Sequence, residues 1–567
     1  MVKVAKSVVL ISDFNIEPFA NYLSNHTGIP PISTSLAPFG QVVQTLIEAD
    51  NEIWSDHRDV IIVWTRPESV IDSFTKLLDF QQVPIEETLA EVDDFATAIA
   101  GICKKAKIIL VPSWVIPDYL HGYGMLDMTK NLGFANTLMR MNLRLVEKLD
   151  KIRNVFVLNT DCWIRKADGE AFNPKLWYMG KIAFGNNVFK MAVKDVKAAL
   201  RGIDGDVRKV IIVDLDETLW GGIVGDIGWQ NIRLGGHDPI GEAFVDFQKA
   251  LKSFTNRGIL LGIVSKNEES VALEAVRSHP EMVLKLDDFA GWRINWDDKA
   301  NNIIELIDEL NLGLQSVVFI DDNPVERARV SEALPEVLVP EWPQDKTLYR
   351  QMLLSLNCFD TPSVSDEDSV RVKMYQTERK REKLRRSFES LEDWLKTLEM
   401  KVHVEPLNEV NIKRASQLLN KTNQMNLSTR RMSETELLDW TQGENRRLWT
   451  FRVSDKFGDS GLTGIASIEH DGKVGRVVDF LLSCRVMGRK IEDLMLSVIT
   501  SYAQSLRSTR VVAKYHKTPK NKPCYDFWKR SGFEHDKLLG TFIWNLEELY
   551  PCPEGIEIIM EKELDFE

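Results

Sequence analysis

Short apolar runs alternate with amphipathic stretches along the first part of the chain. Four continuous apolar runs of strand length predict buried strands at 7–12, 59–64, 107–113 and 154–160. Between them, stretches such as 135–149 carry apolar residues at helical spacing. This alternation predicts an α/β domain over 1–204.

The alternation continues in the middle of the chain. Three apolar runs, each followed by polar residues, predict strands at 210–216, 258–267 and 316–324. Helices are expected between or after them, at about 241–256, 268–277 and 298–310. Such βαβ order predicts a second α/β domain with a parallel sheet over 205–360, which the glycine-containing segment 201–209 separates from the first.

The last part of the chain has a different pattern. The segment 361–400 is expected to be a charged helical connection. From residue 401 to 567 we expect an α+β domain, with one long helix at 490–506 and strands at 402–407, 448–455, 462–470, 475–484 and 510–515.

Composition narrows the function classes. The chain has 567 residues, so three domains are expected. Its formal net charge of −13 disfavours binding to nucleic acid or to an anionic membrane. Its six cysteines form no C-x-x-C pair, which indicates neither a disulfide framework nor a zinc site. No signal peptide and no membrane-spanning segment is apparent. We expect a cytoplasmic protein.

Polar side chains follow each predicted strand of the middle domain. Asp214 and Asp216 follow the first strand, and the other candidates are Thr218, Ser265, Lys266, Asn267, Lys299, Asp321 and Asp322. Because the carboxyl ends of parallel strands share one edge, these groups are expected to meet there. Crowded carboxylates with a lysine and a hydroxyl suit Mg²⁺ and phosphoryl transfer. The alternative is that the acids merely cap helices and that Lys299 is a surface lysine.

These motifs resemble the haloacid dehalogenase (HAD) superfamily, and DLDETLWGGIVGD with VFIDDNPVERARV resembles its FkbH-like branch, subfamily IIIC. The resemblance implies that Asp214 is the nucleophile, that Asp216 is the acid/base and that Thr218 supports it. It further implies phosphate contacts from Ser265, Lys266, Asn267 and Lys299. Mg²⁺ would bind Asp214, the Asp216 carbonyl and Asp322, and Asp321 would be a supporting acid or a water-mediated metal ligand.

FkbH-like proteins are associated with moving a glyceryl-type three-carbon unit from 1,3-bisphosphoglycerate to an acyl carrier protein. The resemblance therefore implies these partners, and the short spacings between motifs leave no room for a large cap domain. Several members carry Cys before the motif Ser, whereas this chain has Val264. This departure leaves open a small-molecule phosphatase without carrier loading, or a non-catalytic binding protein.

The flanking domains carry weaker motifs. The last domain resembles GNAT acyltransferases, which implies an acyl-CoA or pantetheine site at Arg485, Gly488, Arg489 and Asn521, although Lys490 replaces a small residue. The first domain resembles SGNH hydrolases, with Ser12 as a nucleophile remnant that lacks a recognisable base, so capping of its strand end is favoured. The amides of 420–426 and the basic segment 377–387 are candidate binding elements or ordinary surface structure.

Overall fold

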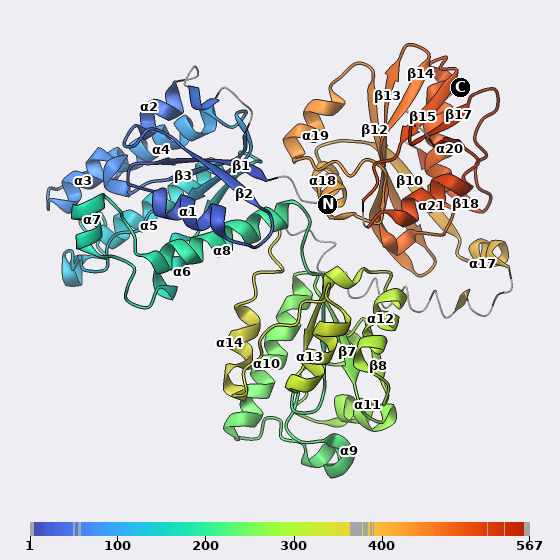
Figure 1. The fold of residues 1–567 in the computed structure, drawn as a ribbon, viewed down its shortest axis with the longest axis horizontal. Coiled ribbons are helices and arrows are strands. Elements are labelled where there is room, and N and C mark those ends of the chain that lie inside the picture. The colour runs from blue at the N-terminus through green and yellow to red at the C-terminus, as the bar shows by residue number, and fades with distance from the viewer. Residues whose placement is uncertain are drawn as a thin grey trace. The chain divides into compact units, whose positions relative to one another are not determined.

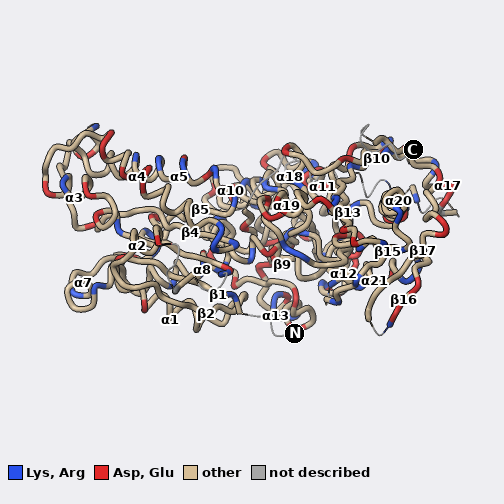
Figure 2. Tube along the Cα trace, turned by 90° about the horizontal axis from the view of Figure 1, so that it is seen from above, with Lys and Arg blue, Asp and Glu red and all other residues tan. Residues whose placement is uncertain are grey.

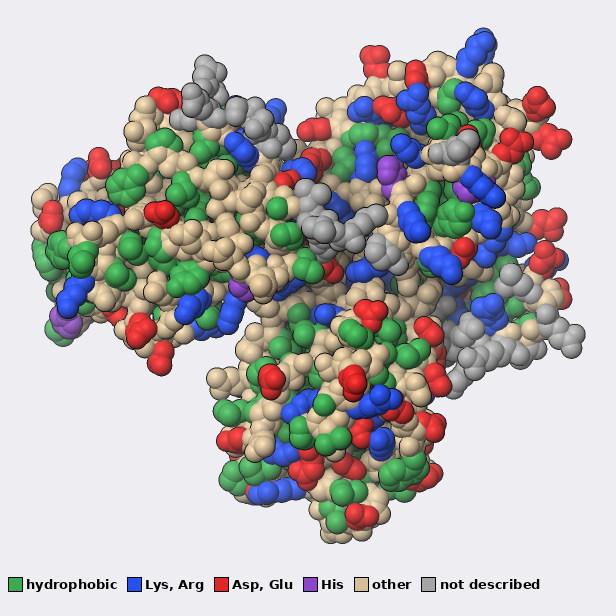
Figure 3. Space-filling model, viewed as in Figure 1, with side chains coloured by type: hydrophobic (Ala, Val, Ile, Leu, Met, Phe, Trp, Pro, Cys, Tyr) green, Lys and Arg blue, Asp and Glu red, His purple; other side chains and the backbone are tan. Residues whose placement is uncertain are grey.

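The computed structural model describes residues 5–48, 52–54, 58–362, 377, 381, 384–385, 388, 390–518, 520–537 and 539–560. The chain divides into two compact units, Met1–Arg201 and Gly202–Glu567. The described residues form three separate sheets, of which the first lies in the first unit and the others in the second (Figure 1). Acidic and basic residues are interspersed along the chain (Figure 2) and mixed on the face shown in Figure 3.

The first unit is built on a parallel sheet with strand order β2-β1-β3-β4-β5. Its strands are β1 (Lys6–Ser12), β2 (Ile32–Leu36), β3 (Arg58–Trp64), β4 (Ala106–Pro112) and β5 (Val155–Leu158). Its helices are α1 (Glu17–Asn25), α2 (Val42–Ile47), α3 (Asp72–Leu78), α4 (Ile85–Gly101), α5 (Phe134–Leu149), α6 (Thr160–Lys166), α7 (Pro174–Gly180) and α8 (Asn186–Ile203).

Side chains alternate between the two faces of this sheet. Val9 and Ile11 pack in one core with Phe95 of α4 and Leu145 of α5. On the other face, Trp64 contacts aromatic rings of α1, α6 and α8. Both faces are therefore covered by helices, as expected for a buried parallel sheet.

The middle sheet is parallel, with strand order β8-β7-β6-β9. Its strands are β6 (Val210–Val213), β7 (Leu260–Ser265), β8 (Gly291–Ile294) and β9 (Val317–Ile320). The helices are α9 (Val224–Ile227), α10 (Pro239–Asn256), α11 (Glu269–Ser278), α12 (Lys299–Glu309), α13 (Pro324–Ala333) and α14 (Tyr349–Leu354). The expected parallel sheet is present, and the chain between β6 and α10 forms only short helical segments.

The third sheet is mixed, with order β16-β17-β15-β14-β13-β12-β10-β18 and a short strand β11 (Met425–Asn426) beside β14. Its strands are β10 (Met400–Pro406), β12 (Arg446–Asp455), β13 (Gly458–Asp471), β14 (Val474–Leu482), β15 (Arg510–Lys514), β16 (Glu534–Asp536), β17 (Thr541–Asn545) and β18 (Ile556–Met560). Its helices are α17 (Leu391–Thr397), α18 (Ile412–Lys421), α19 (Glu434–Thr441), α20 (Ile491–Ser505) and α21 (Lys522–Arg530). Within the described residues, no helix is both long and apolar enough to cross a membrane.

Candidate active site

The candidate site begins where β6 ends. The four residues of β6 are fully buried, and pairing with β9 continues one residue further, because the Asp214 N–H donates to the Ile320 carbonyl at 3.0 Å. This bond fixes the start of the loop that carries the acids. The Asp214 side chain is itself buried, so its carboxylate needs a nearby positive charge.

Lys299 supplies that charge from the first turn of α12. Its Nζ lies 3.0 Å from Asp214 Oδ1 and 2.6 Å from Asp321 Oδ2, and all three side chains are buried. Burial lowers the pKa of Lys299, but Asp214 and Asp321 outweigh it and the net shift is upwards. Lys299 is therefore a buried cation between two carboxylates and not a surface lysine.

The site holds more negative than positive charge. The carboxylate oxygens of Asp214, Asp321 and Asp322 include atoms that all lie within 4.8 Å of one another. Burial and the Asp214 carboxylate raise the pKa of Asp321 to about 6, although Lys299 opposes the shift. Burial also raises the pKa of Asp322. Burial thus favours the protonated form of Asp321 and Asp322, and a bound cation would favour their charged form.

The donor set fits a hard divalent cation. Three carboxylates within reach of one point offer the oxygen ligands that Mg²⁺ prefers. Asp214 Oδ1 is buried and has no aligned hydrogen-bond donor among the described residues, although Lys299 lies at ion-pair distance. A cation bound by Asp214, Asp321 and Asp322 would satisfy that oxygen.

Thr218 orients Asp322. Its hydroxyl donates to Asp322 Oδ1 at 3.3 Å and accepts the Asp322 backbone N–H at 3.1 Å. Thr218 is completely buried, whereas the Asp322 side chain is partly exposed. Thr218 was expected to support Asp216, but its hydroxyl binds Asp322 instead. These hydrogen bonds link the loop after β6 to the loop after β9.

Asp216 lies apart from the carboxylate cluster in its hydrogen bonding. Oδ1 accepts from Trp220 Nε1 at 2.8 Å and from the Val224 N–H at 3.1 Å, and Oδ2 accepts from Asn267 Nδ2 at 2.8 Å. Burial raises the pKa of Asp216 despite these donors. A raised pKa suits a proton donor, and Oδ2 accepts one hydrogen bond, which leaves its second lone pair for a proton.

The residues predicted to contact phosphate lie in different surroundings. Ser265 ends β7 at the same sheet edge and is buried. Asn267 binds Asp216, as described above. Lys266 pairs with Glu326 of α13 at 2.7 Å, so its charge is directed at that carboxylate.

One site residue, Lys346, carries no signal in the sequence. It begins the short helix η7 (Lys346–Leu348), and its Nζ donates to the Glu217 carbonyl at 2.7 Å and to the Tyr349 hydroxyl at 2.9 Å. It also lies 3.7 Å from Asp322 Oδ2. Glu217 has a φ of 55°, a conformation disfavoured for side chains with a Cβ, so Lys346 helps to hold a strained loop.

The predicted acyl-CoA residues use their polar groups within the protein. The Gly488 N–H donates to Glu492 Oε1 at 2.8 Å, which occupies a group that a pyrophosphate would need. Arg489 is buried and donates to the Arg485 carbonyl at 2.6 Å. Asn521 is buried and donates to the carbonyls of Asn426 and His516. The acyl-CoA or pantetheine site at these residues stays a prediction.

The other flanking candidates behave as local structure. Ser12 Oγ accepts the Phe14 N–H at 3.2 Å, which is the capping role that the sequence favours. Within 420–426, Asn420 exchanges hydrogen bonds with the backbone of Met432, and Asn426 donates to the Thr422 carbonyl. Most of the basic segment 377–387 lies outside the described residues.

Three solved structures are similar to parts of the chain. One is the N-terminal part of a Bacteroides fragilis protein that contains a phosphatase domain complexed with Mg; it has 29% sequence identity and a TM-score of 0.57, and covers 63% of this chain and 95% of that one. A GNAT-family acetyltransferase from Staphylococcus aureus Mu50 has 9% identity and a TM-score of 0.21, over 26% of this chain and 99% of its own.

The third is the ribosomal-protein-S18-alanine N-acetyltransferase from Escherichia coli, with 9% identity and a TM-score of 0.19, over 25% of this chain and 90% of its own. The two acetyltransferase scores are too low to support a conclusion. No protein-family model and no curated protein matches the chain. The first similarity shows that 63% of the chain resembles the fold of a protein that contains a phosphatase domain.

Proposed function

We propose that the carboxyl edge of the middle sheet carries out Mg²⁺-dependent phosphoryl transfer of the HAD type. The observation that carries the proposal is the cluster of Asp214, Asp321 and Asp322 around the buried Lys299. The similarity to a phosphatase-containing protein complexed with Mg supports it. When bound, Mg²⁺ would supply charge compensation for the carboxylates and for substrate phosphate.

Each residue of the site has its own role in the proposed reaction. The Asp214 carboxylate attacks phosphorus and forms an acyl phosphate while the bond to the leaving oxygen breaks. Asp216 donates its proton to that oxygen and then removes a proton from the water that hydrolyses the acyl phosphate. Lys299 holds Asp214 in place and offsets charge on the phosphoryl oxygens, and Ser265 offers them a hydroxyl donor.

Phosphate release tests this proposal. The full chain is incubated with para-nitrophenyl phosphate and a panel of phosphorylated metabolites, with Mg²⁺ or with EDTA. We expect release with Mg²⁺, none with EDTA, and a loss of about a thousandfold or more in Asp214→Asn, as for removal of other covalent nucleophiles. Asp308→Asn, an exposed change on α12, is the matched control. Equal activity of Asp214→Asn and the control would contradict the assigned nucleophile.

The resemblance to FkbH-like proteins motivates a finer proposal, in which a glyceryl-type unit passes from 1,3-bisphosphoglycerate to an acyl carrier protein. Neither neighbour of Ser265 is a cysteine: Val264 precedes it, buried within β7, and Lys266 follows it. Burial also raises the pKa of the Cys524 thiol to about 12, so that thiol stays protonated and is a poor nucleophile. Transfer would therefore proceed without a cysteine at the motif.

Intact mass of a holo carrier protein separates the two activities. The chain is incubated with 1,3-bisphosphoglycerate, Mg²⁺ and candidate holo carriers, and both carrier mass and free phosphate are measured. A glyceryl mass increase that requires the chain supports transfer. If phosphate is released but the mass of a cognate carrier does not increase, the phosphatase activity stands and the transferase activity is rejected.

A further inference from the structure

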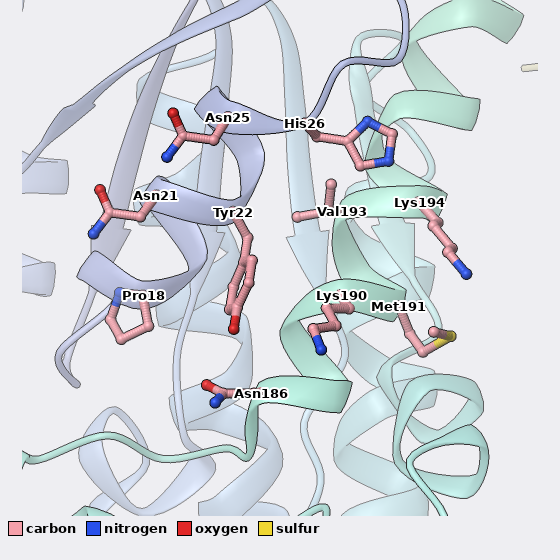
Figure 4. A pocket seen from close by; sticks show the side chains of 10 residues that line it. All are labelled: Pro18, Asn21, Tyr22, Asn25, His26, Asn186, Lys190, Met191, Val193 and Lys194. Carbon is pink, nitrogen blue, oxygen red and sulfur yellow. The ribbon is translucent and has the colours of Figure 1, made fainter.

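A groove of about 700 Å³ lies between α1 and α8 in the first unit (Figure 4). Its lining residues come from α1, from His26 directly after it, and from α8, which is far away in sequence: Pro18, Asn21, Tyr22, Asn25, His26, Asn186, Lys190, Met191, Val193 and Lys194. No part of the proposed phosphoryl-transfer site contributes to it. Its size falls in the range of small-ligand sites in proteins.

The helical repeat explains why the lining residues of α1 lie together. On α1, Pro18, Asn21, Tyr22 and Asn25 recur at intervals of three and four residues and therefore share one face. The neighbouring faces of both helices are anchored on the sheet by buried residues such as Phe19 and Phe189. The helices are thus held in position, and the groove is a fixed feature of their packing.

The walls combine apolar surface with cations. Tyr22, Met191 and Val193 offer apolar surface, and Lys190 Nζ lies 5.9 Å from the centroid of the Tyr22 ring. Lys190 and Lys194 are exposed and lie one helical turn apart. None of the described residues that line the groove is acidic, although the chain as a whole has a net charge of −13.

Further cations follow the groove-lining residues along α8. Lys197 is buried and its Nζ donates to the carbonyls of His26 and Gly28 at 2.8 and 2.6 Å. Burial and the charges of Lys197, Arg201 and Lys194 hold the pKa of His26 below its ordinary value. The two carbonyls that Lys197 contacts carry no net charge, so Lys197 adds to the positive field of the lysines that line the groove.

We propose that the α1–α8 groove binds a small organic anion that carries an apolar body, of the class of medium-chain carboxylates. The anionic head pairs with Lys190 and Lys194, and the chain lies along Tyr22 and Met191. The amides of Asn21, Asn25 and Asn186 supply polar contacts along the walls. A small anion is favoured over an acidic protein helix, because the long-range repulsion from a chain of net charge −13 grows with the charge of the partner.

The methyl signal of Met191 reports occupancy at this position. The full chain is labelled with [methyl-¹³C]methionine, and the Met191 signal among the 16 methionines is assigned with Met191→Leu. The probes are octanoate, octan-1-ol with the same body but no charge, and acetate with the charge but no body. We expect octanoate to shift the Met191 signal saturably, with at least about tenfold weaker effects of the two others.

A charge-reversed variant tests the role of the lysines. In Lys190→Glu/Lys194→Glu we expect octanoate affinity to fall about tenfold or more, because two attractions become repulsions. Lys104→Glu/Lys151→Glu makes the same change in charge at exposed lysines that do not line the groove, and should bind as the wild type does. Circular dichroism and thermal unfolding establish that both variants fold.

Three results would overturn the proposal. Octanoate could leave the Met191 signal unshifted, octan-1-ol could bind as well as octanoate, or charge reversal could leave octanoate affinity unchanged. An acidic amphipathic peptide that shifts the signal where octanoate does not would assign the groove to a protein partner instead.

Discussion

At the scale of single residues, Lys299 determines the charge balance of the candidate site. It is a buried cation that contacts both Asp214 and Asp321. Removing one partner of a buried ion pair leaves an uncompensated charge, which is far more costly than removing an exposed pair.

We therefore expect Lys299→Met to lower the free energy of unfolding by about 3–5 kcal/mol in EDTA. The loss should be smaller with Mg²⁺, because a divalent cation replaces the missing positive charge. Urea unfolding followed by circular dichroism, with and without Mg²⁺, measures both values. Lys249→Met removes an exposed lysine paired with Asp246 and should change stability by less than about 0.5 kcal/mol. Equal decreases in the free energy of unfolding of the two variants would show that the Lys299 ion pairs stabilise the fold no more than an exposed pair does.

Lys346 is expected to position the loop after β6 and not to increase the affinity for Mg²⁺. Lys346→Met removes the hydrogen bond to the Glu217 carbonyl and a positive charge near Asp322. We expect kcat to fall about tenfold, equivalent to one hydrogen bond with a charged group. The affinity for Mg²⁺ should not weaken, because the site becomes more negative.

Steady-state kinetics and calorimetric Mg²⁺ titration separate these effects, and Lys346→Arg, which keeps the charge and a donor, is the conservative comparison. Weaker Mg²⁺ binding with unchanged kcat in Lys346→Met would contradict the positioning role.

The residues that sequence could predict are those that follow strands. Asp214, Asp321 and Asp322 come directly after buried strands of one parallel sheet, so strand order alone brings them together. Lys346 meets Glu217 across 129 positions of sequence and lies on a short helix, so no local pattern marks it. Lys266 was predicted to contact phosphate, but its pairing with Glu326 depends on how α13 packs.

At the scale of elements, the N-terminal end of α12 positions Lys299. Asp298 caps this helix, because its side chain accepts the N–H groups of Ala300 and Asn301, and Lys299 is the next residue. Asp298 Oδ2 also pairs with Arg329 of α13 at 3.1 Å. The cap thus fixes both the start of the helix and the base of the lysine side chain.

We expect Asp298→Ala to lower stability by about 1 kcal/mol, the usual cost of losing an N-cap. Asp298→Asn keeps the cap but not the charge and should recover most of that loss. Thermal unfolding of the three proteins in parallel measures the difference. The cap would be unimportant if Asp298→Ala unfolded at the same temperature as the wild type.

Elements with continuous apolar patterns could be predicted, and short edge strands could not. The helix expected at 241–256 is present as α10, Pro239–Asn256. The edge strand β8 was not predicted: it has four residues, of which Trp292 and Arg293 are only half-buried, so it lacks a long apolar run. A strand of this kind depends on its pairing with β7 more than on its own composition.

At the scale of the whole molecule, the candidate chemistry lies within one compact unit. All of the residues assigned to phosphoryl transfer lie in Gly202–Glu567, and the α1–α8 groove lies in the other unit. The predicted division into a domain at 205–360, a connection at 361–400 and a domain at 401–567 stays a prediction, since Gly202–Glu567 is one compact unit.

We therefore expect residues 202–567, produced alone, to keep Mg²⁺-dependent phosphate release within a few-fold of the full chain. Residues 1–201 should show none. Rates normalised to folded protein, with folding checked by circular dichroism, make the comparison. Activity that requires both units, although 202–567 is folded, would show that the first unit completes the site.

The most direct test of the central claim is to trap the acyl phosphate on Asp214. The full chain is mixed with a substrate found in the phosphate-release panel and Mg²⁺, quenched rapidly and treated with borohydride, which reduces an aspartyl phosphate to homoserine. Peptide mass spectrometry should find homoserine at position 214, and none in EDTA or in Asp214→Asn. Rapid phosphate release with unmodified Asp214 and the modification at another residue, or at none, would contradict the account.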